Sequence, residues 1–249
     1  MAKAHPSTSI LWTQVWGLAA MQGAITLMWV IYNLYLVELL TQFGFPRPLA
    51  TGLLVIENLL AMVMEPLMGA FSDGLQHRVG TRFPFISLGV VLTAGCFLAI
   101  PIISFGGQAP LLRWLLPLMM VAWALAMTVF RSPAMSLLGR YAFRTQLPQA
   151  ASILTLVSGV AGASGPLANQ FILNLGPMVA FGIGSAVLLL STLALSRFSP
   201  NATVTSPNAT GPSSVKPEAG ESPKKQPLAW QNLGFIFGAG VGISLGFRL

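Results

Sequence analysis

The sequence predicts an all-α membrane protein, with a bundle of six transmembrane helices followed by one further transmembrane helix. Three observations support this prediction. Of the 249 residues, 54% are hydrophobic and only 8% are charged, and the mean hydropathy is +0.74, a composition that requires lipid as the main solvent. The apolar residues fall into segments of about 20, the length that a helix needs to cross the hydrocarbon core. The basic residues gather in alternate connections between these segments.

Each apolar segment is expected to be a helix, because irregular backbone and open strand edges are not tolerated against lipid. In chain order the segments are Val15–Leu36, Leu49–Phe71, Phe85–Phe105, Leu115–Leu138, Ala150–Leu173, Pro177–Leu195 and Leu228–Phe247. Between the sixth and the seventh, Pro, Ser, Thr, Asn, Gly, Lys and Glu dominate, which predicts a flexible linker. The predicted organisation is a six-helix unit over residues 1–198, a cytoplasmic linker over 199–227 and a seventh helix over 228–249.

The basic residues predict a cytoplasmic N-terminus, because cytoplasmic connections of membrane proteins carry an excess of Lys and Arg. With that orientation the outer side holds three basic residues, Arg47, Arg113 and Arg248, and Arg131 lies inside the fourth helix. The cytoplasmic side holds nine, which are Lys3, Arg78, Arg82, Arg140, Arg144, Arg197, Lys216, Lys224 and Lys225. This asymmetry accounts for the net charge of +7 without a nucleic-acid partner.

The composition also argues against several kinds of site. The one cysteine, Cys96, cannot form an internal disulfide, and the two histidines, His5 and His77, lie far apart in the sequence, so neither a metal site nor a disulfide framework is expected. The sequence has no Ser/His/Asp set, no paired carboxylates in an aqueous cleft and no Gly-rich phosphate loop. We therefore expect neither an enzyme nor a bound cofactor.

A motif between the second and third segments resembles a known family. The stretch Glu65-Pro-Leu-Met-Gly-Ala-Phe-Ser-Asp73, followed by Gly80-Thr-Arg-Phe-Pro-Phe-Ile86, resembles the "PLxGxxSD" and "GRRRPFI" elements of sucrose–proton symporters and of the wider glycoside–pentoside–hexuronide:cation symporters. Both belong to the major facilitator superfamily. Thr81 and Phe83 replace two arginines of the pattern, and Gly139 stands where the family places an acid after the fourth helix.

The resemblance implies a fold and a function. It implies the N-terminal half of a transporter whose two six-helix halves enclose a site at the membrane midplane, plus the opening helix of the second half. Cation-coupled symport of a glycoside or similar small solute, with a proton or sodium, across the plasma (inner) membrane by alternating access is then expected. Two alternatives remain, a non-transporting scaffold or pigment-assembly factor of the same superfamily, and an inactive truncated product.

Three charged residues lie within the predicted membrane spans, where a charge costs roughly 2.5–3.5 kcal/mol and therefore indicates function. Glu57 lies about 12 Å below the outer end of its helix at 1.5 Å per residue, where a carboxyl group could bind and release a coupling proton. The alternative is a glutamate in a water-filled vestibule that only helps to bind solute or to keep the cavity wet. Glu65 and Arg131 are each sixteen residues past the outer start of their helices. We expect them to form a buried pair, in which Glu65 has a structural role and Arg131 a role in solute contact or in coupling.

Polar and aromatic side chains mark a candidate solute surface. Helix spacing places Gln22, Trp29 and Asn33 on one face of the first helix, where amides could bond sugar hydroxyl groups and an indole could stack on a pyranose ring. Asn58, beside Glu57, and Trp123 on the fourth helix complete the predicted set. The alternative is that these residues are polar contacts between helices.

The remaining candidates lie at the helix ends. The resemblance implies a gating role for Asp73 in the connection after the second helix, and Arg78 and Arg82 either take part in gating or fix the topology. In the seventh segment Gly234, Gly238, Gly242 and Gly246 form one stripe, at which another helix could approach closely. This stripe predicts contact with a missing C-terminal half or self-association.

Overall fold

The computed structural model describes residues 10–79, 83–106, 110–142 and 146–198, with the backbone alone for 73–79, 110 and 111. All the regular structure in these ranges is α-helical, and six of the helices are long and apolar enough to cross a membrane. The helices are α1 Trp12–Gln42, α2 Arg47–Val79, α3 Phe83–Phe105, α4 Pro110–Ser136, α5 Leu138–Tyr141, α6 Leu147–Asn174 and α7 Pro177–Phe198. The first six predicted spans are thus confirmed, and the linker and the seventh helix lie outside the described residues.

Most helices extend beyond the apolar segment from which they were predicted. The clearest case is α2, which continues through the polar stretch to Val79. The prediction that Asp73 and Arg78 lie in a loop is therefore wrong: both are helical. A helix satisfies its own backbone hydrogen bonds, so a polar sequence can continue it past the end of the apolar segment.

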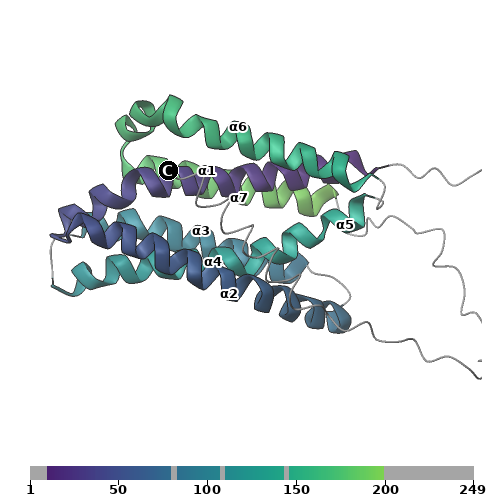
Figure 1. Cartoon of the computed structure of the whole chain (residues 1–249), viewed down its shortest axis with the longest axis horizontal. Coiled ribbons are helices and arrows are strands. Elements are labelled where there is room, and N and C mark those ends of the chain that lie inside the picture. The colour runs from purple at the N-terminus through teal and green to yellow at the C-terminus, as the bar shows by residue number, and fades with distance from the viewer. Residues whose placement is uncertain (1–9, 80–82, 107–109, 143–145, 199–249) are drawn as a thin grey trace, which may run out of the picture. The chain divides into compact units, whose positions relative to one another are not determined.

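The six spanning helices form two groups of three (Figure 1). Helix α1 packs against α6 and α7, helix α4 packs against α2 and α3, and α3 meets α7 between the groups. The first helix of each half of the sequence therefore packs on the second and third helices of the other half, an internal symmetry that transporter folds share. The turns after α1 and after α6 each contain a glycine with positive φ, Gly44 at 73° and Gly176 at 78°, which closes a helix C-terminus at little steric cost.

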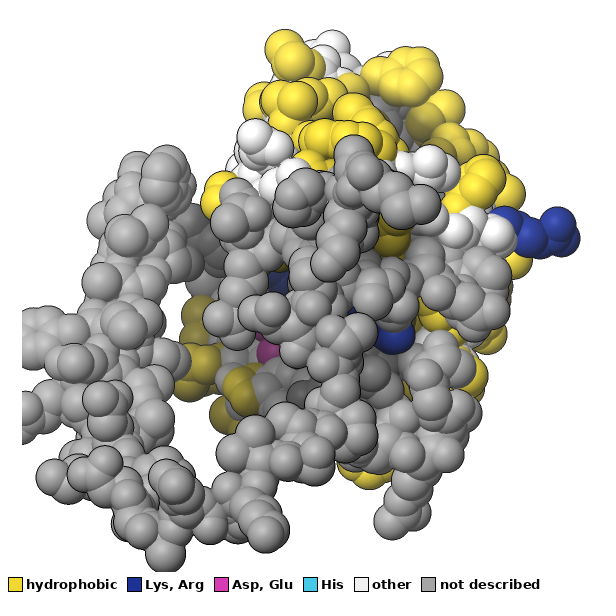
Figure 2. Space-filling view, turned by 90° about the vertical axis from the view of Figure 1, so that its right-hand side faces the viewer, with side chains coloured by type: hydrophobic (Ala, Val, Ile, Leu, Met, Phe, Trp, Pro, Cys, Tyr) yellow, Lys and Arg dark blue, Asp and Glu magenta, His cyan; other side chains and the backbone are white. Residues whose placement is uncertain are grey.

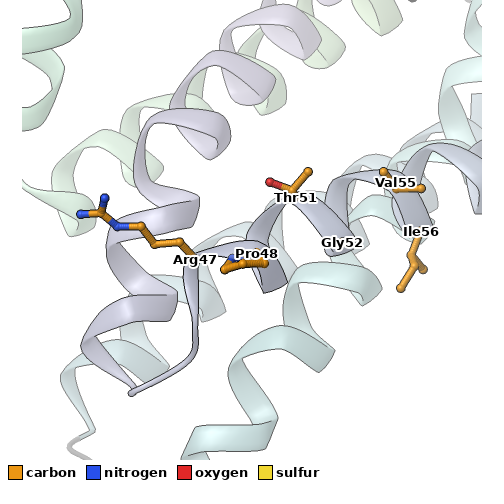
Figure 3. Close-up of a pocket in the computed structure, with 6 residues that line it drawn as sticks. All are labelled: Arg47, Pro48, Thr51, Gly52, Val55 and Ile56. Atoms are coloured by element: carbon orange, nitrogen blue, oxygen red, sulfur yellow. The ribbon is translucent and has the colours of Figure 1, made fainter.

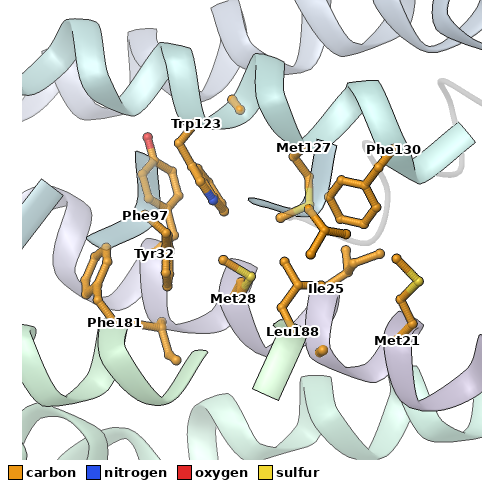
Figure 4. Packing of buried hydrophobic residues seen from close by; sticks show 14 of the residues in the cluster. Met21, Ile25, Met28, Tyr32, Phe97, Trp123, Met127, Phe130, Phe181 and Leu188 are labelled. Carbon is orange, nitrogen blue, oxygen red and sulfur yellow. The ribbon is translucent and has the colours of Figure 1, made fainter. Parts of the chain in front are cut away.

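The apolar core lies where α1, α3, α4 and α7 meet (Figure 4). By contrast, only 11% of the most apolar stretch of α2 and 17% of that of α6 is buried, against 56% for α1. Large apolar side chains such as Leu59 and Phe71 on α2 and Leu167 on α6 are more than half exposed. Hydrophobic side chains also make up much of the described surface at the end of the bundle shown in Figure 2. A surface of this kind requires lipid or another transmembrane segment as its neighbour.

Candidate functional site

The first element of the candidate site is a buried carboxyl group. Glu57 lies on α2 with 1% of its surface exposed, although its neighbours Ile56 and Asn58 point outward. The hydroxyl group of Tyr32, on α1, donates a hydrogen bond of 2.5 Å to Glu57 Oε1. The second oxygen, Oε2, has no hydrogen-bond partner among the described residues. Buried polar atoms are nearly always satisfied, so this oxygen stands out as one that can still accept a hydrogen bond or a proton.

An aromatic cluster surrounds this hydrogen bond. The Tyr32 ring lies 4.5 Å from the Trp123 ring of α4 and 5.8 Å, edge to face, from the Trp29 ring. The two indoles are themselves 4.9 Å apart. Phe97 of α3 and Phe181 of α7 extend the cluster across the bundle, with centroids 4.3 Å apart. Figure 4 shows Tyr32, Trp123, Phe97 and Phe181 gathered in one region of the core.

The second element of the site is an ion pair between α2 and α4. Arg131 Nη1 lies 3.1 Å from Glu65 Oε1, so the predicted pair forms, but it is not buried: the side chains are 39% and 36% exposed. Gly69, one turn after Glu65, lets the helices approach at this level, because a Cβ there would lie 2.9 Å from Ser132 Oγ. The ion pair is therefore accessible from one side of the bundle.

The two elements lie at different depths along α2. Glu65 follows Glu57 by eight residues on α2, and Arg131 follows Trp123 by eight residues on α4. At 1.5 Å per residue the separation along each helix is about 12 Å. The Glu57 carboxyl group, bonded to α1, and the ion pair with α4 thus form two polar levels along α2.

The predicted amide residues of α1 and α2 take two kinds of position. Gln22 is partly buried, and its Oε1, itself shielded from solvent, has no partner among the described residues. Asn33 is exposed, and its amide bonds the Trp29 carbonyl oxygen at 2.7 Å. Asn58 likewise bonds the Leu54 carbonyl oxygen at 2.6 Å, which makes both amides local helix contacts in this conformation.

Trp123 does not lie on the solute-contacting surface on which it was predicted. Its side chain is fully buried, and its Nε1 has no hydrogen-bond partner among the described residues. Contact with solute would require the neighbouring helices to move, so its binding role, like that of Trp29 and Gln22, stays a prediction. The roles of Asp73 and Arg78 also stay predictions, since the structure gives only their backbone, while Arg82 and the Gly234–Gly246 stripe lie outside the described residues.

Two hollows in the described surface lie away from these residues. The larger, of about 760 Å³, lies beside the first turns of α2 and is lined by Arg47, Pro48, Thr51, Gly52, Val55 and Ile56 (Figure 3). The smaller, of about 250 Å³, lies at the α1–α2 turn, where Arg113 donates a hydrogen bond to the Gly44 carbonyl oxygen at 3.3 Å. Neither contains a predicted site residue.

Tyr32 was not among the candidate residues predicted from the sequence. Its phenol group lies in the middle of an apolar helix, where a hydroxyl group must find a partner. It also follows Trp29 by three residues and thus lies on nearly the same face. These signals mark Tyr32 for attention, but only the fold shows that its partner is Glu57.

Comparison with known proteins establishes the family. The family model of the Major Facilitator Superfamily matches residues 18–248. The chain belongs to this superfamily. It is therefore an integral, multi-pass membrane protein of a family whose members are transporters rather than enzymes.

The curated relatives are distant and much longer. The chain is 30% identical to proton-associated sugar transporter A of Mus musculus and of Rattus norvegicus over an aligned stretch of 102 residues. This stretch covers 41% of this chain and 13% of each relative. The Homo sapiens protein of the same name is 35% identical over 72 residues, 29% of this chain and 9% of that protein. The matches thus span well under two thirds of the relatives' length. No solved structure matches the chain.

Proposed function

We propose that this chain provides the N-terminal half of a secondary active transporter that couples proton movement to the symport of a glycoside or similar small solute. The observation that carries the proposal is the buried Glu57 carboxyl group, hydrogen-bonded to Tyr32, whose ring packs against the indoles of Trp29 and Trp123. A carboxyl group shielded from water and able to take up a proton is what proton coupling requires. The name of the relatives, proton-associated sugar transporter A, supports the same solute and ion.

The Glu65–Arg131 pair has a second role in this proposal. Its exposed side offers the guanidinium group to solute hydroxyl groups, and the pair can break and re-form as the helices rock during alternating access. Gln22 and the indole of Trp29 would contribute further solute contacts. The proposed orientation has the N-terminus in the cytoplasm and the plasma membrane as the location.

The decisive experiment measures proton movement in vesicles that contain the transporter. We expect sucrose, or another member of a panel with maltose and raffinose, to drive proton entry reported by a pH-sensitive dye. In the Glu57→Gln variant, accumulation against a solute gradient is lost while solute exchange persists, because exchange needs no net proton transfer.

The control for this experiment is Glu38→Gln, which removes an exposed carboxylate near the end of α1 and should leave accumulation unchanged. Unaltered accumulation in Glu57→Gln would remove Glu57 from the coupling role. Absence of solute-dependent proton movement with the whole panel would instead favour a scaffold role.

A further inference from the structure

We infer that Tyr32 is the positioning residue through which protonation of Glu57 changes the packing of α2 against α1. This inference rests on the proposed proton-coupling role of Glu57 and adds to it the element that responds to the proton. No property of the solute enters the argument.

The hydrogen bond joins two helices that otherwise touch little. Helices α1 and α2 have few contacts with each other, since α2 packs mainly against α4, and few residues in the most apolar stretch of α2 are buried. The bond between Tyr32 and Glu57 is buried at both ends, with 0% and 1% of the two residues exposed. A bond to a buried group contributes more to the association of two helices where other contacts are sparse.

The strength of this bond depends on the charge of its acceptor. A hydrogen bond to an ionised carboxylate is roughly twice as strong as one between neutral groups. When a proton adds to Glu57, Tyr32 keeps its own proton and donates to a neutral carboxyl group. The attachment of α2 to α1 therefore weakens on proton binding, and α2 becomes freer to move.

A second tyrosine on α1 provides a contrast that does not depend on protonation. Tyr35 donates to the Ile172 carbonyl oxygen at 2.7 Å, and thereby satisfies a carbonyl group in the last turn of α6. Both tyrosines are buried, and both rings belong to the aromatic cluster, since Tyr35 lies 5.7 Å from Phe181. A main-chain carbonyl does not titrate, so the attachment of α6 stays constant while that of α2 changes.

Other titratable or charged groups lie further along the helices packed around Glu57. On α1 these are Tyr35 and Glu38, on α4 they are Arg113 and Arg131, and on α2 itself Glu65 pairs with Arg131. Tyr32 is the group among the described residues that bonds Glu57 directly. Any response of this contact to pH should therefore disappear when either Tyr32 or Glu57 is replaced.

The first test is infrared spectroscopy of the whole chain in lipid nanodiscs, titrated from neutral to acid pH. The carbonyl band of protonated Glu57 is identified by its loss in Glu57→Gln. In Tyr32→Phe this band should move to higher wavenumber, because the carbonyl oxygen loses a donor, while in Tyr35→Phe it should stay in place. A band unchanged by Tyr32→Phe overturns the inference but leaves the proposed function standing. Absence of any band lost in Glu57→Gln overturns both.

The second test measures the distance between α1 and α2. Spin labels are attached through Thr13→Cys on α1 and Leu67→Cys on α2, both at exposed positions, with Cys96→Ser as the background. We expect the distance distribution to differ between neutral and acid pH in this parent and in Tyr35→Phe. In Tyr32→Phe and in Glu57→Gln the two distributions should coincide. A parent that does not respond, or a Tyr32→Phe variant that responds as the parent does, overturns the inference.

Discussion

At the scale of single residues, a close contact between α3 and α4 depends on the absence of a side chain at Gly89. A Cβ built there would lie 2.7 Å from the Cβ of Phe130 and 3.1 Å from its backbone nitrogen. Since the obstructing atoms are fixed by the backbone of α4, the neighbour cannot rotate away. Phe130 is fully buried, so any adjustment must separate the two helices.

We therefore predict that Gly89→Ala destabilises the bundle by about 1–3 kcal/mol, the usual cost of overpacking a core. The matched control is Gly95→Ala on the same helix, where nothing lies within 4 Å of the added methyl group. The control should be neutral or slightly stabilising, since alanine favours helix by about 1 kcal/mol over glycine. Heat unfolding in detergent, followed by tryptophan fluorescence, measures both variants, and equal midpoints would contradict the prediction.

At the scale of helices, the Glu65–Arg131 pair connects α2 to α4. With more than a third of each side chain exposed, the pair itself should contribute only about 0.2–1 kcal/mol. A single charge left on the interface costs more, because it has no partner in a mostly apolar environment.

We predict that the double variant Glu65→Gln with Arg131→Gln is better expressed and unfolds at a higher temperature than Arg131→Gln alone. Neutralising both groups removes the unpaired charge that the single variant leaves behind. The corresponding control combines Glu38→Gln with Arg131→Gln. In this control the effects of the two substitutions on expression and on unfolding temperature should simply add. If the double variant is expressed no better than Arg131→Gln alone and unfolds at no higher temperature, the side chains of Glu65 and Arg131 do not interact.

At the scale of the whole molecule, the orientation in the membrane is still a prediction. Thr41 near the end of α1 and Phe198 at the end of α7 are both exposed and should lie on opposite sides. In a Cys96→Ser background, we expect Thr41→Cys to react with a membrane-impermeant maleimide added to intact cells, and Phe198→Cys to react only after the cells are opened. The reverse pattern would place the N-terminus outside and would contradict the distribution of basic residues.

The sequence was sufficient for the architecture because membrane helices obey strong local rules. Apolar length, basic residues and the need for internal backbone hydrogen bonds are all visible along the chain, so the six described spans and the superfamily were predictable. Charged residues within the spans likewise marked Glu57, Glu65 and Arg131 as candidates. Similar distances from the starts of their helices predicted that Glu65 would meet Arg131, because α2 and α4 run in the same direction.

Only the tertiary structure decided which faces of the helices meet. It placed Trp123 inside the core, left the ion pair partly exposed and gave Glu57 a partner, Tyr32, that the sequence analysis had not selected. These outcomes depend on the rotation of each helix about its own axis, and an apolar helix carries little sequence signal for that rotation: α3, for example, is apolar all round. Rotation is set by close packing between helices, at contacts such as Gly89 against Phe130, which exist only once the bundle has formed.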